Sequence, residues 1–203
     1  MTAVPEDHWL LGIQPQPLTA EEYEGLPESV SEMIEVVDGH VVFCEAPTRR
    51  HQRAGRRLAN LIERQASTAM RSGYGCVEVD TDVDLRLYDV PLTVRRPDVV
   101  LYRCLQGDER LRSKHVLLVV EIVSPGSEMS DTTDKFGEYA KVGIPHYWIV
   151  RLDDTGVSVI ERYQLDRAAM LYKHTGTFMK DEGGAPEVGN PIPVTIDWAE
   201  LEY

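Results

Sequence analysis

A single carboxylate interrupts the most apolar run of the chain, and this residue constrains the fold more than any other. The run covers residues 116–123, Val-Leu-Leu-Val-Val-Glu-Ile-Val, and Glu121 is its charged member. A run of this kind is typical of a strand that is buried on both faces of a sheet. A buried carboxylate loses its water at a cost of several kcal/mol unless a cation or hydrogen-bond donors replace it. We therefore predict a central strand that carries a functional acid.

Two further charged residues flank this strand in the sequence. Asp98 opens a second apolar run, residues 97–102, and Lys135 lies on a helix expected at 131–141. Sites with few oxygen ligands favour Mg²⁺ or Mn²⁺, and a lysine beside them can orient a water or stabilise developing charge. The three residues therefore suggest a metal-dependent hydrolase site suited to phosphodiesters.

Each of these residues also has a purely structural interpretation. Asp98 can start a strand and accept hydrogen bonds from nearby backbone N–H groups. Glu121 can be a buried acid paired with an arginine such as Arg96, and Lys135 can be a solvated helix lysine that bridges to Asp131. Both interpretations stay open on the residues alone.

The remaining pattern predicts an α/β fold with a mixed sheet flanked by helices. Thr19-Ala20-Glu21-Glu22 is a capping-box pattern for a helix at 20–25, and Asp38-Gly39 separates two strands of a hairpin, 34–37 and 40–44. Strand, helix and strand around Glu121 predict a parallel βαβ unit. No domain boundary is visible, so we expect an irregular arm over 1–17 and a single domain over 18–203. Further strands are expected at 76–80, 82–88, 97–102, 116–123, 146–151, 156–163, 168–174 and 191–198.

A long amphipathic helix is expected over 49–71, and it is the basic stretch of the sequence. One face gathers arginines and the opposite face is apolar, with His51 on the apolar side. The arginines form either a solvated helix face or a track for a phosphate backbone. His51 is either a hydrogen-bonded core residue or a site residue. The basic face comprises Arg49, Arg53, Arg56, Arg57, Asn60 and Arg64, and the apolar face comprises Ala54, Leu58, Leu61, Ile62 and Ala69.

The overall composition limits the partners and the compartment. The net charge is −13 and the sequence pI is about 4.9, which argues against broad, charge-driven nucleic-acid binding but not against a local basic site. We see neither an apolar stretch long enough to span a membrane nor a secretory signal, so we expect a cytoplasmic protein without a membrane partner. The three cysteines, Cys44, Cys76 and Cys104, fit neither a disulfide framework nor a zinc site, and we expect reduced core residues.

An ordered set of motifs resembles the Uma family of putative restriction endonucleases, within the PD-(D/E)XK nuclease superfamily. The resemblance covers about Leu18 to Trp198. The motifs are Arg96-Pro97-Asp98-Val99-Val100, Val119 through Glu121 to Ser127, Asp131 through Lys135 to Tyr139, and Gly143-Ile144-Pro145-His146-Tyr147-Trp148, with Ile34-Glu35-Val36-Val37-Asp38-Gly39 and His51 upstream.

The resemblance implies a restriction-endonuclease-like core with extra N-terminal and C-terminal strands, and a divalent metal held by Asp98, Glu121 and the backbone carbonyl of Ile122. The superfamily lysine lies two residues after the second acid, where this chain has Val123, so the catalytic lysine is expected to be Lys135. The expected roles of the other residues follow from the same resemblance and from the arginine face. Glu35 is an additional catalytic acid, and His51, Arg53, Arg57 and Tyr139 are candidate substrate contacts. The family's usual acid after the Tyr-Trp strand is replaced by Arg151, which we expect to affect a turn.

Two functions of different kinds follow from these observations. The first is an Mg²⁺- or Mn²⁺-dependent endonuclease that hydrolyses DNA, and a homodimer is expected by analogy with enzymes that cut two strands. The second is a catalytically silent module for DNA binding or assembly, which the acidic net charge favours. A glycosidase built on a carboxylate pair is disfavoured by the nearby lysine and by the absence of aromatic-rich segments that stack on sugars. The target sequence and any methyltransferase partner cannot be predicted.

Overall fold

The computed structural model describes residues 17–44, 46–123 and 130–203, with backbone alone at 130 and 131. The expected N-terminal arm, apart from Pro17, and the Ser124–Ser127 part of the family motif lie outside the described residues. The chain divides into two compact units, one formed by Met1–Cys44 with Tyr88–Arg95 and the other by Glu45–Leu87 with Arg96–Tyr203. The expectation of one domain over 18–203 stays a prediction.

The first unit is built around the predicted hairpin. Asp38 and Gly39 have φ values of 49° and 80°, which suit a two-residue turn that requires positive φ at both positions. The capping box forms at Thr19 and Glu22, which confirms the predicted first helix. The unit contains α1 (Ala20–Glu24), α2 (Glu28–Ser31), β1 (Ile34–Val37), β2 (His40–Phe43) and β5 (Leu92–Arg95). Strand β1 pairs antiparallel with both β2 and β5, and its apolar residues pack under α1.

The second unit carries a six-stranded mixed sheet in the order β10-β9-β8-β7-β6-β3. Strands β7 and β8 run parallel and are joined through α4, while the neighbouring pairs on either side are antiparallel. The predicted mixed sheet and βαβ unit are therefore confirmed. The unit contains α3 (Arg49–Arg71), β3 (Val77–Asp80), the first part of β4 (Leu85–Asp89), β6 (Val99–Arg103), β7 (Val116–Ile122), α4 (Lys135–Lys141), β8 (His146–Leu152), β9 (Val157–Asp166), β10 (Leu171–Met179), β11 (Glu187–Val188) and β12 (Val194–Thr195).

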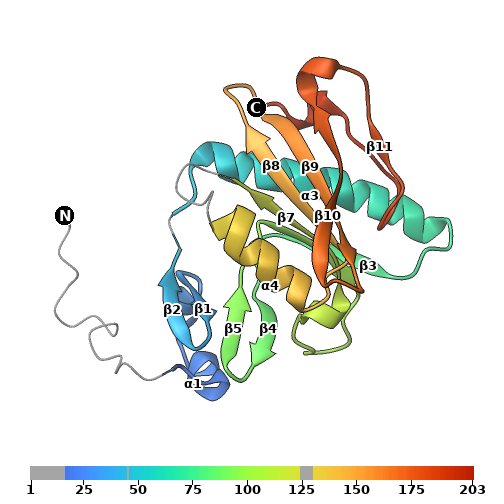
Figure 1. The fold of residues 1–203 in the computed structure, drawn as a ribbon. Coiled ribbons are helices and arrows are strands. Elements are labelled where there is room, and N and C mark those ends of the chain that lie inside the picture. Colours follow the sequence, from blue (N-terminus) through green and yellow to red (C-terminus); the bar gives the residue numbers. More distant parts are fainter. Residues whose placement is uncertain (1–16, 45, 124–129) are drawn as a thin grey trace. The chain divides into compact units, whose positions relative to one another are not determined.

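Both faces of this sheet are covered, because alternate residues of its central strands enter two different clusters. Val99 and Leu101 of β6 pack in the cluster that contains the buried face of α3. Val100 of β6 packs in a second cluster with Tyr139 of α4 and Tyr147 of β8. Figure 1 shows α3 (teal) and α4 (yellow) on opposite sides of the sheet strands. Strand β7 is buried along its whole length, as its apolar run predicted.

Helix α3 has the predicted bounds and orientation. Thr48 caps its first turn by accepting a hydrogen bond from the His51 backbone N–H, and the predicted apolar residues are buried. Its arginines lie on the faces turned away from the sheet. None of the helices within the described ranges combines the length and apolar character that a membrane-spanning helix requires.

Two expected elements differ from the structure, and one strand was not expected. The helix expected at 131–141 begins as a π-helical turn, Ser130–Asp134, and continues as α4. The strand expected at 191–198 is reduced to β12, which pairs with β11 and is followed by a 3₁₀ turn, Trp198–Leu201. The unexpected strand is β5, whose four residues are buried between β1 and β4 in their sheet.

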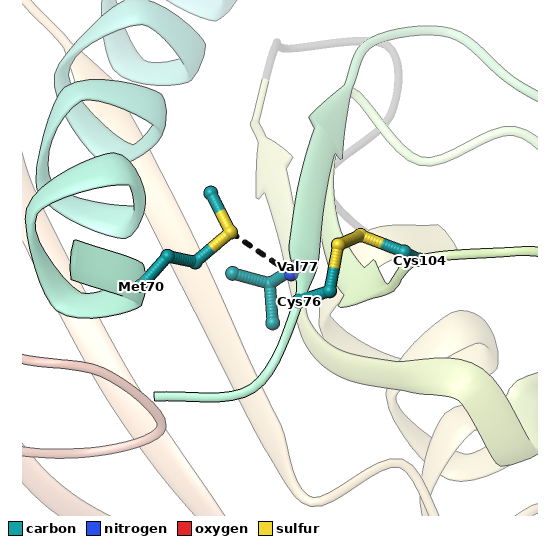
Figure 2. Close-up of a disulfide and its surroundings, with 4 residues drawn as sticks. All are labelled: Met70, Cys76, Val77 and Cys104. Carbon is teal, nitrogen blue, oxygen red and sulfur yellow. Dashed lines mark hydrogen bonds between the residues drawn. A yellow bond between two sulfur atoms is a disulfide. The ribbon is translucent and has the colours of Figure 1, made fainter. Parts of the chain in front are cut away.

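The prediction of three reduced core cysteines is wrong. Cys76 and Cys104 form a disulfide with a Cα–Cα distance of 5.4 Å, and Cys44 is exposed and takes no part in this disulfide. Figure 2 shows the disulfide next to Val77, whose backbone N–H donates to Met70 Sδ of α3 at 3.4 Å. The antiparallel pairing of Val77 with Arg103 brings the two cysteines together at the ends of β3 and β6. An odd cysteine count did not exclude this pairing, because the disulfide needs only two of the three cysteines.

Candidate active site

The two predicted acids come from neighbouring strands of the sheet, β6 and β7. Val99 lies opposite Val120 in this antiparallel pair, and Asp98 is the residue immediately before β6. The Asp98 carboxylate accepts a hydrogen bond from the backbone N–H of Ile122, the residue after Glu121. Two residues that lie 23 positions apart in the sequence therefore come from adjoining ends of one strand pair, and a shared site for their carboxylates stays a prediction.

Asp98 is held by the backbone of the facing strand and by the first turn of α3. Its Oδ2 accepts a hydrogen bond from the Ile122 N–H at 2.5 Å and lies 3.3 Å from His51 Nε2. The same His51 nitrogen lies 3.0 Å from the Ile122 carbonyl oxygen. The Asp98 and His51 side chains are 15% and 17% exposed, so this group of atoms remains reachable from solvent.

Glu121 is almost completely buried, and α4 supplies both of its described side-chain partners. Lys135 Nζ donates to Glu121 Oε2 at 3.1 Å, and the Tyr139 hydroxyl donates to Oε1 at 2.9 Å. Lys135 and Tyr139 are four positions apart and share one helix face, so a single turn of α4 reaches both carboxylate oxygens. A lysine and a tyrosine of α4 thus supply hydrogen-bond donors to this buried acid.

A cleft of about 220 Å³ opens beside Asp98 and His51. Its remaining lining comes from the first turns of α3 and from the segment between β3 and β4. It therefore gives access to the Asp98 carboxylate. The cleft is lined by Pro47, His51, Gln52, Gly55, Arg56, Thr81, Asp82 and Asp98.

Asp82 is a site residue that the sequence analysis missed. It has a φ of 53°, and Arg96 donates to its backbone carbonyl oxygen. Loss of water around its carboxylate and the negative charge of Asp98 raise the pKa of Asp82, while the charges of His51, Arg96 and Lys135 partly offset this rise. Lys135 therefore acts electrostatically on the cleft as well as on Glu121. Asp82 lies in a short turn without a recognisable motif, so its neighbours follow from the fold alone.

The surroundings of His51 also alter its pKa. Burial alone would lower the pKa of His51, but the hydrogen bond and the charge of Asp98, with the Ile122 carbonyl and Asp82, together raise it above its ordinary value. The imidazole therefore lies in a region of concentrated negative potential. His51 lines the cleft, which agrees with a site role better than with a core role.

Other predicted site residues have partners of their own. Glu35 belongs to the first unit, where its carboxylate forms a buried ion pair with Arg95 at 2.8 Å. On α3, Arg57 donates to the Glu200 carbonyl oxygen at 2.9 Å and Arg64 pairs with the Glu200 carboxylate. These two arginines hold the C-terminal segment, while Arg53 is exposed and Arg56 lines the cleft. The catalytic role of Glu35 and the substrate roles of Arg53 and Arg57 stay predictions.

The described part of the chain contains no cluster of three or more His, Cys, Asp and Glu side chains arranged to hold a metal ion. A protein-only metal cage is therefore absent from these residues. Mg²⁺ commonly binds through one or two carboxylates and completes its shell with waters and substrate phosphate oxygens. The pair Asp98 and Glu121, with the Ile122 carbonyl, matches that sparse kind of ligand set.

The fold and the order of the motifs agree with comparisons to known proteins. A crystal structure of a nuclease from Anabaena variabilis ATCC 29413, described as a putative nuclease belonging to DUF820, matches with a TM-score of 0.58 and 16% identity, covering 84% of this chain and 89% of that chain. This likeness confirms the expected nuclease-like fold. No curated protein matches the chain. The family model Uma2, described as a putative restriction endonuclease, matches residues 20–188. The chain therefore belongs to the Uma2 family of putative restriction endonucleases, as its motifs implied.

Proposed function

We propose that the protein is a nuclease that hydrolyses DNA phosphodiester bonds with the help of Mg²⁺ or Mn²⁺. One observation carries the proposal, which is that the Asp98 carboxylate accepts from the backbone N–H of Ile122, next to Glu121, while Lys135 contacts Glu121. The description of the family and that of the Anabaena structure support the same class of reaction.

The residues at this position fit a hard divalent cation. The available donors are carboxylate and carbonyl oxygens, which Mg²⁺ and Mn²⁺ prefer. Burial and then the negative charge of Asp98 raise the pKa of Asp82, and a cation would relieve the repulsion between the two carboxylates. Asp98, Glu121 and the Ile122 carbonyl would hold the ion. When bound, such an ion makes a coordinated water more acidic and stabilises charge on the phosphate.

Lys135 supplies the second part of the proposed chemistry. Its ammonium group is held by Glu121 and acts electrostatically on Asp82. From this position it can orient the attacking water or stabilise the charge that develops on the phosphate oxygens. Tyr139 fixes the other oxygen of Glu121, which keeps the carboxylate in one orientation.

Substrate contacts are expected around the mouth of the cleft. Gln52 follows His51 directly on α3, Arg56 lies more than one turn further along the same helix, and both line the cleft. An arginine at this place can contact a backbone phosphate despite the net charge of −13, because salt screens distant charges beyond about 10 Å. Arg53 is exposed on the same helix and is the second candidate.

The direct test is cleavage of supercoiled plasmid DNA by the purified protein. We expect nicking or linearisation with Mg²⁺ or Mn²⁺ that is abolished by EDTA and by Asp98→Asn. The matched control is Asp154→Asn, which removes an exposed acid that pairs with Arg50 on the surface. Circular dichroism establishes that each variant is folded. Equal cleavage by wild type and Asp98→Asn would remove the assignment.

A catalytically silent DNA-binding or assembly module is the second candidate. The observation that favours it is that both Glu121 oxygens already accept hydrogen bonds from Lys135 and Tyr139. Calorimetric titration with Mn²⁺ separates the two, because a silent module has no reason to keep an affinity that depends on Asp98. A homodimer acting on two strands belongs to the nuclease proposal, and light scattering at several concentrations tests it.

A further inference from the structure

His51 presents one ring nitrogen to two oxygen atoms from different strands. Its Nε2 lies 3.0 Å from the Ile122 carbonyl oxygen and 3.3 Å from Asp98 Oδ2. Asp98 Oδ2 in turn accepts from the Ile122 backbone N–H. These contacts link α3, the start of β6 and the end of β7 in one group of atoms.

The chemistry of these neighbours determines which ring nitrogen carries a proton. A carbonyl oxygen and a carboxylate oxygen both accept hydrogen bonds, so Nε2 must be the donor toward them. A protonated Nε2 has no lone pair to offer a metal ion. Its hydrogen instead points toward the same two oxygens that the proposed function assigns to the cation.

The backbone of His51 is held in place by the start of the helix. His51 lies in the first turn of α3, and its backbone N–H is bonded to the capping Thr48 hydroxyl oxygen. The neighbouring cleft of about 220 Å³ is lined by the imidazole itself and offers space into which the ring can rotate. The backbone can therefore stay in place while the side chain changes rotamer.

We propose that His51 is a positioning residue whose Nε2–H occupies the cation position between Asp98 and the Ile122 carbonyl in the metal-free protein. A divalent cation and this N–H group then compete for the same oxygens, and loading requires the ring to leave them. The inference rests on the proposed function, because it assumes that these two oxygens bind the cation. It differs from that proposal in making the histidine a competitor rather than a ligand or a substrate contact.

Calorimetric titration of the full-length protein with Mn²⁺ tests the competition. Removing a hydrogen bond to a charged group should strengthen Mn²⁺ binding about tenfold in His51→Ala. The matched control is His174→Ala, which removes an exposed histidine of β10 and should leave the affinity unchanged. Weaker Mn²⁺ binding by folded His51→Ala would mean that the ring is a ligand and would overturn the inference.

A second measurement does not depend on the variant folding. In metal-free wild type, nitrogen NMR of the histidine rings should show a proton on Nε2 of His51, and Mg²⁺ should shift this signal. An unprotonated Nε2, or a signal that Mg²⁺ leaves unchanged at saturation, would overturn the inference. If metal-dependent cleavage persists although the His51 inference is overturned, the proposed nuclease function stands without that inference. If neither wild type nor His51→Ala binds Mn²⁺, the inference and the proposed function are both overturned.

Discussion

Lys135 Nζ lies 3.1 Å from Glu121 Oε2 in the interior of the protein, where the two side chains are 11% and 2% exposed. Both charges have lost most of their water, so each depends on the other for compensation. The Tyr139 hydroxyl adds a hydrogen bond to the second oxygen of the same carboxylate. The arrangement serves the stability of the protein as well as its proposed chemistry.

Removing Lys135 alone should therefore destabilise the protein strongly. Lys135→Met leaves Glu121 buried without its cation, and we expect the free energy of unfolding to fall by about 3 kcal/mol. The double variant Glu121→Gln/Lys135→Met should recover most of this loss, because neither charge remains. Urea denaturation measures both values, with Lys141→Met at the exposed end of α4 as the control. A Lys135→Met variant as stable as the control would contradict the burial of a charged pair.

Asp82 should oppose the stability of the metal-free protein and support metal binding. The pKa of Asp82 is raised in the folded state, so folding at neutral pH disfavours its charged carboxylate and costs stability. This cost disappears when the pH falls below the pKa of the unfolded chain, because the carboxyl group is then protonated in both the folded and the unfolded protein. Asp82→Asn should therefore raise the free energy of unfolding at pH 7, since asparagine also tolerates positive φ.

The same substitution should weaken Mn²⁺ binding about tenfold, the usual scale for a residue just outside a ligand shell. Urea denaturation and calorimetry on one preparation supply both measurements. A variant that is less stable at pH 7 and binds Mn²⁺ as tightly as wild type would show that Asp82 has only a structural role in its turn.

The disulfide should contribute substantially to stability in an oxidising solution. Cys76 and Cys104 are separated by 28 positions, and closing a loop of this size restricts the unfolded chain by about 3 kcal/mol. We expect Cys76→Ser/Cys104→Ser, or reduction of wild type, to lower the free energy of unfolding by that amount. Cys44→Ser is the control, because this cysteine is exposed and lies outside the disulfide. Mass spectrometry after alkylation counts the thiols, and three reactive thiols in the oxidised, unfolded wild type would contradict the bond.

His146 should make the protein less stable in mild acid. Burial lowers the pKa of His146 below its ordinary value of 6.5, and its partners on the flanking strands are the uncharged Leu118 and Gln164. His146 therefore binds a proton more readily in the unfolded chain than in the folded protein. Its stabilising contribution to the free energy of unfolding is complete above pH 6.5 and is lost as the pH falls toward the lower pKa of the folded state.

His146→Gln should reduce this pH dependence. The stability difference between wild type and variant should shift in favour of the variant between pH 7 and pH 5, as measured by urea denaturation at several values. A difference that is constant across this range would show that His146 does not change its pKa on folding.

Elements determined by neighbouring residues could be predicted from the sequence. The Asp38-Gly39 turn needs only two residues that tolerate positive φ, and α3 needs only its apolar period and the Thr48 cap. Glu121 was recognisable because a charge in an apolar run requires a partner. Lys135 was identified by its place on the helix after this run, and its catalytic role and that of Tyr139 were proposed through the family resemblance. Both residues contact Glu121 from one helix face.

Features that depend on distant pairing could not be predicted in this way. Asp82 reaches the cleft because of where the turn after β3 lies, and no local pattern marks it. The disulfide depends on the register of β3 and β6, and the burial of Glu35 with Arg95 depends on the pairing of β1 and β5. The arginines of α3 were correctly placed on an exposed face, but the contact of Arg57 with Glu200 requires the path of the C-terminal segment.

The central claim is that Asp98, Glu121 and the Ile122 carbonyl share one divalent cation. The most direct measurement is a crystal structure of the wild-type protein with Mn²⁺, using the anomalous scattering of manganese to locate the ion. We predict an anomalous peak about 2.2 Å from oxygens of both carboxylates, with the His51 ring rotated away from Asp98 and the Ile122 carbonyl. An Mn²⁺-saturated crystal without a peak between Asp98 and Glu121, and with the His51 contacts unchanged, would contradict it.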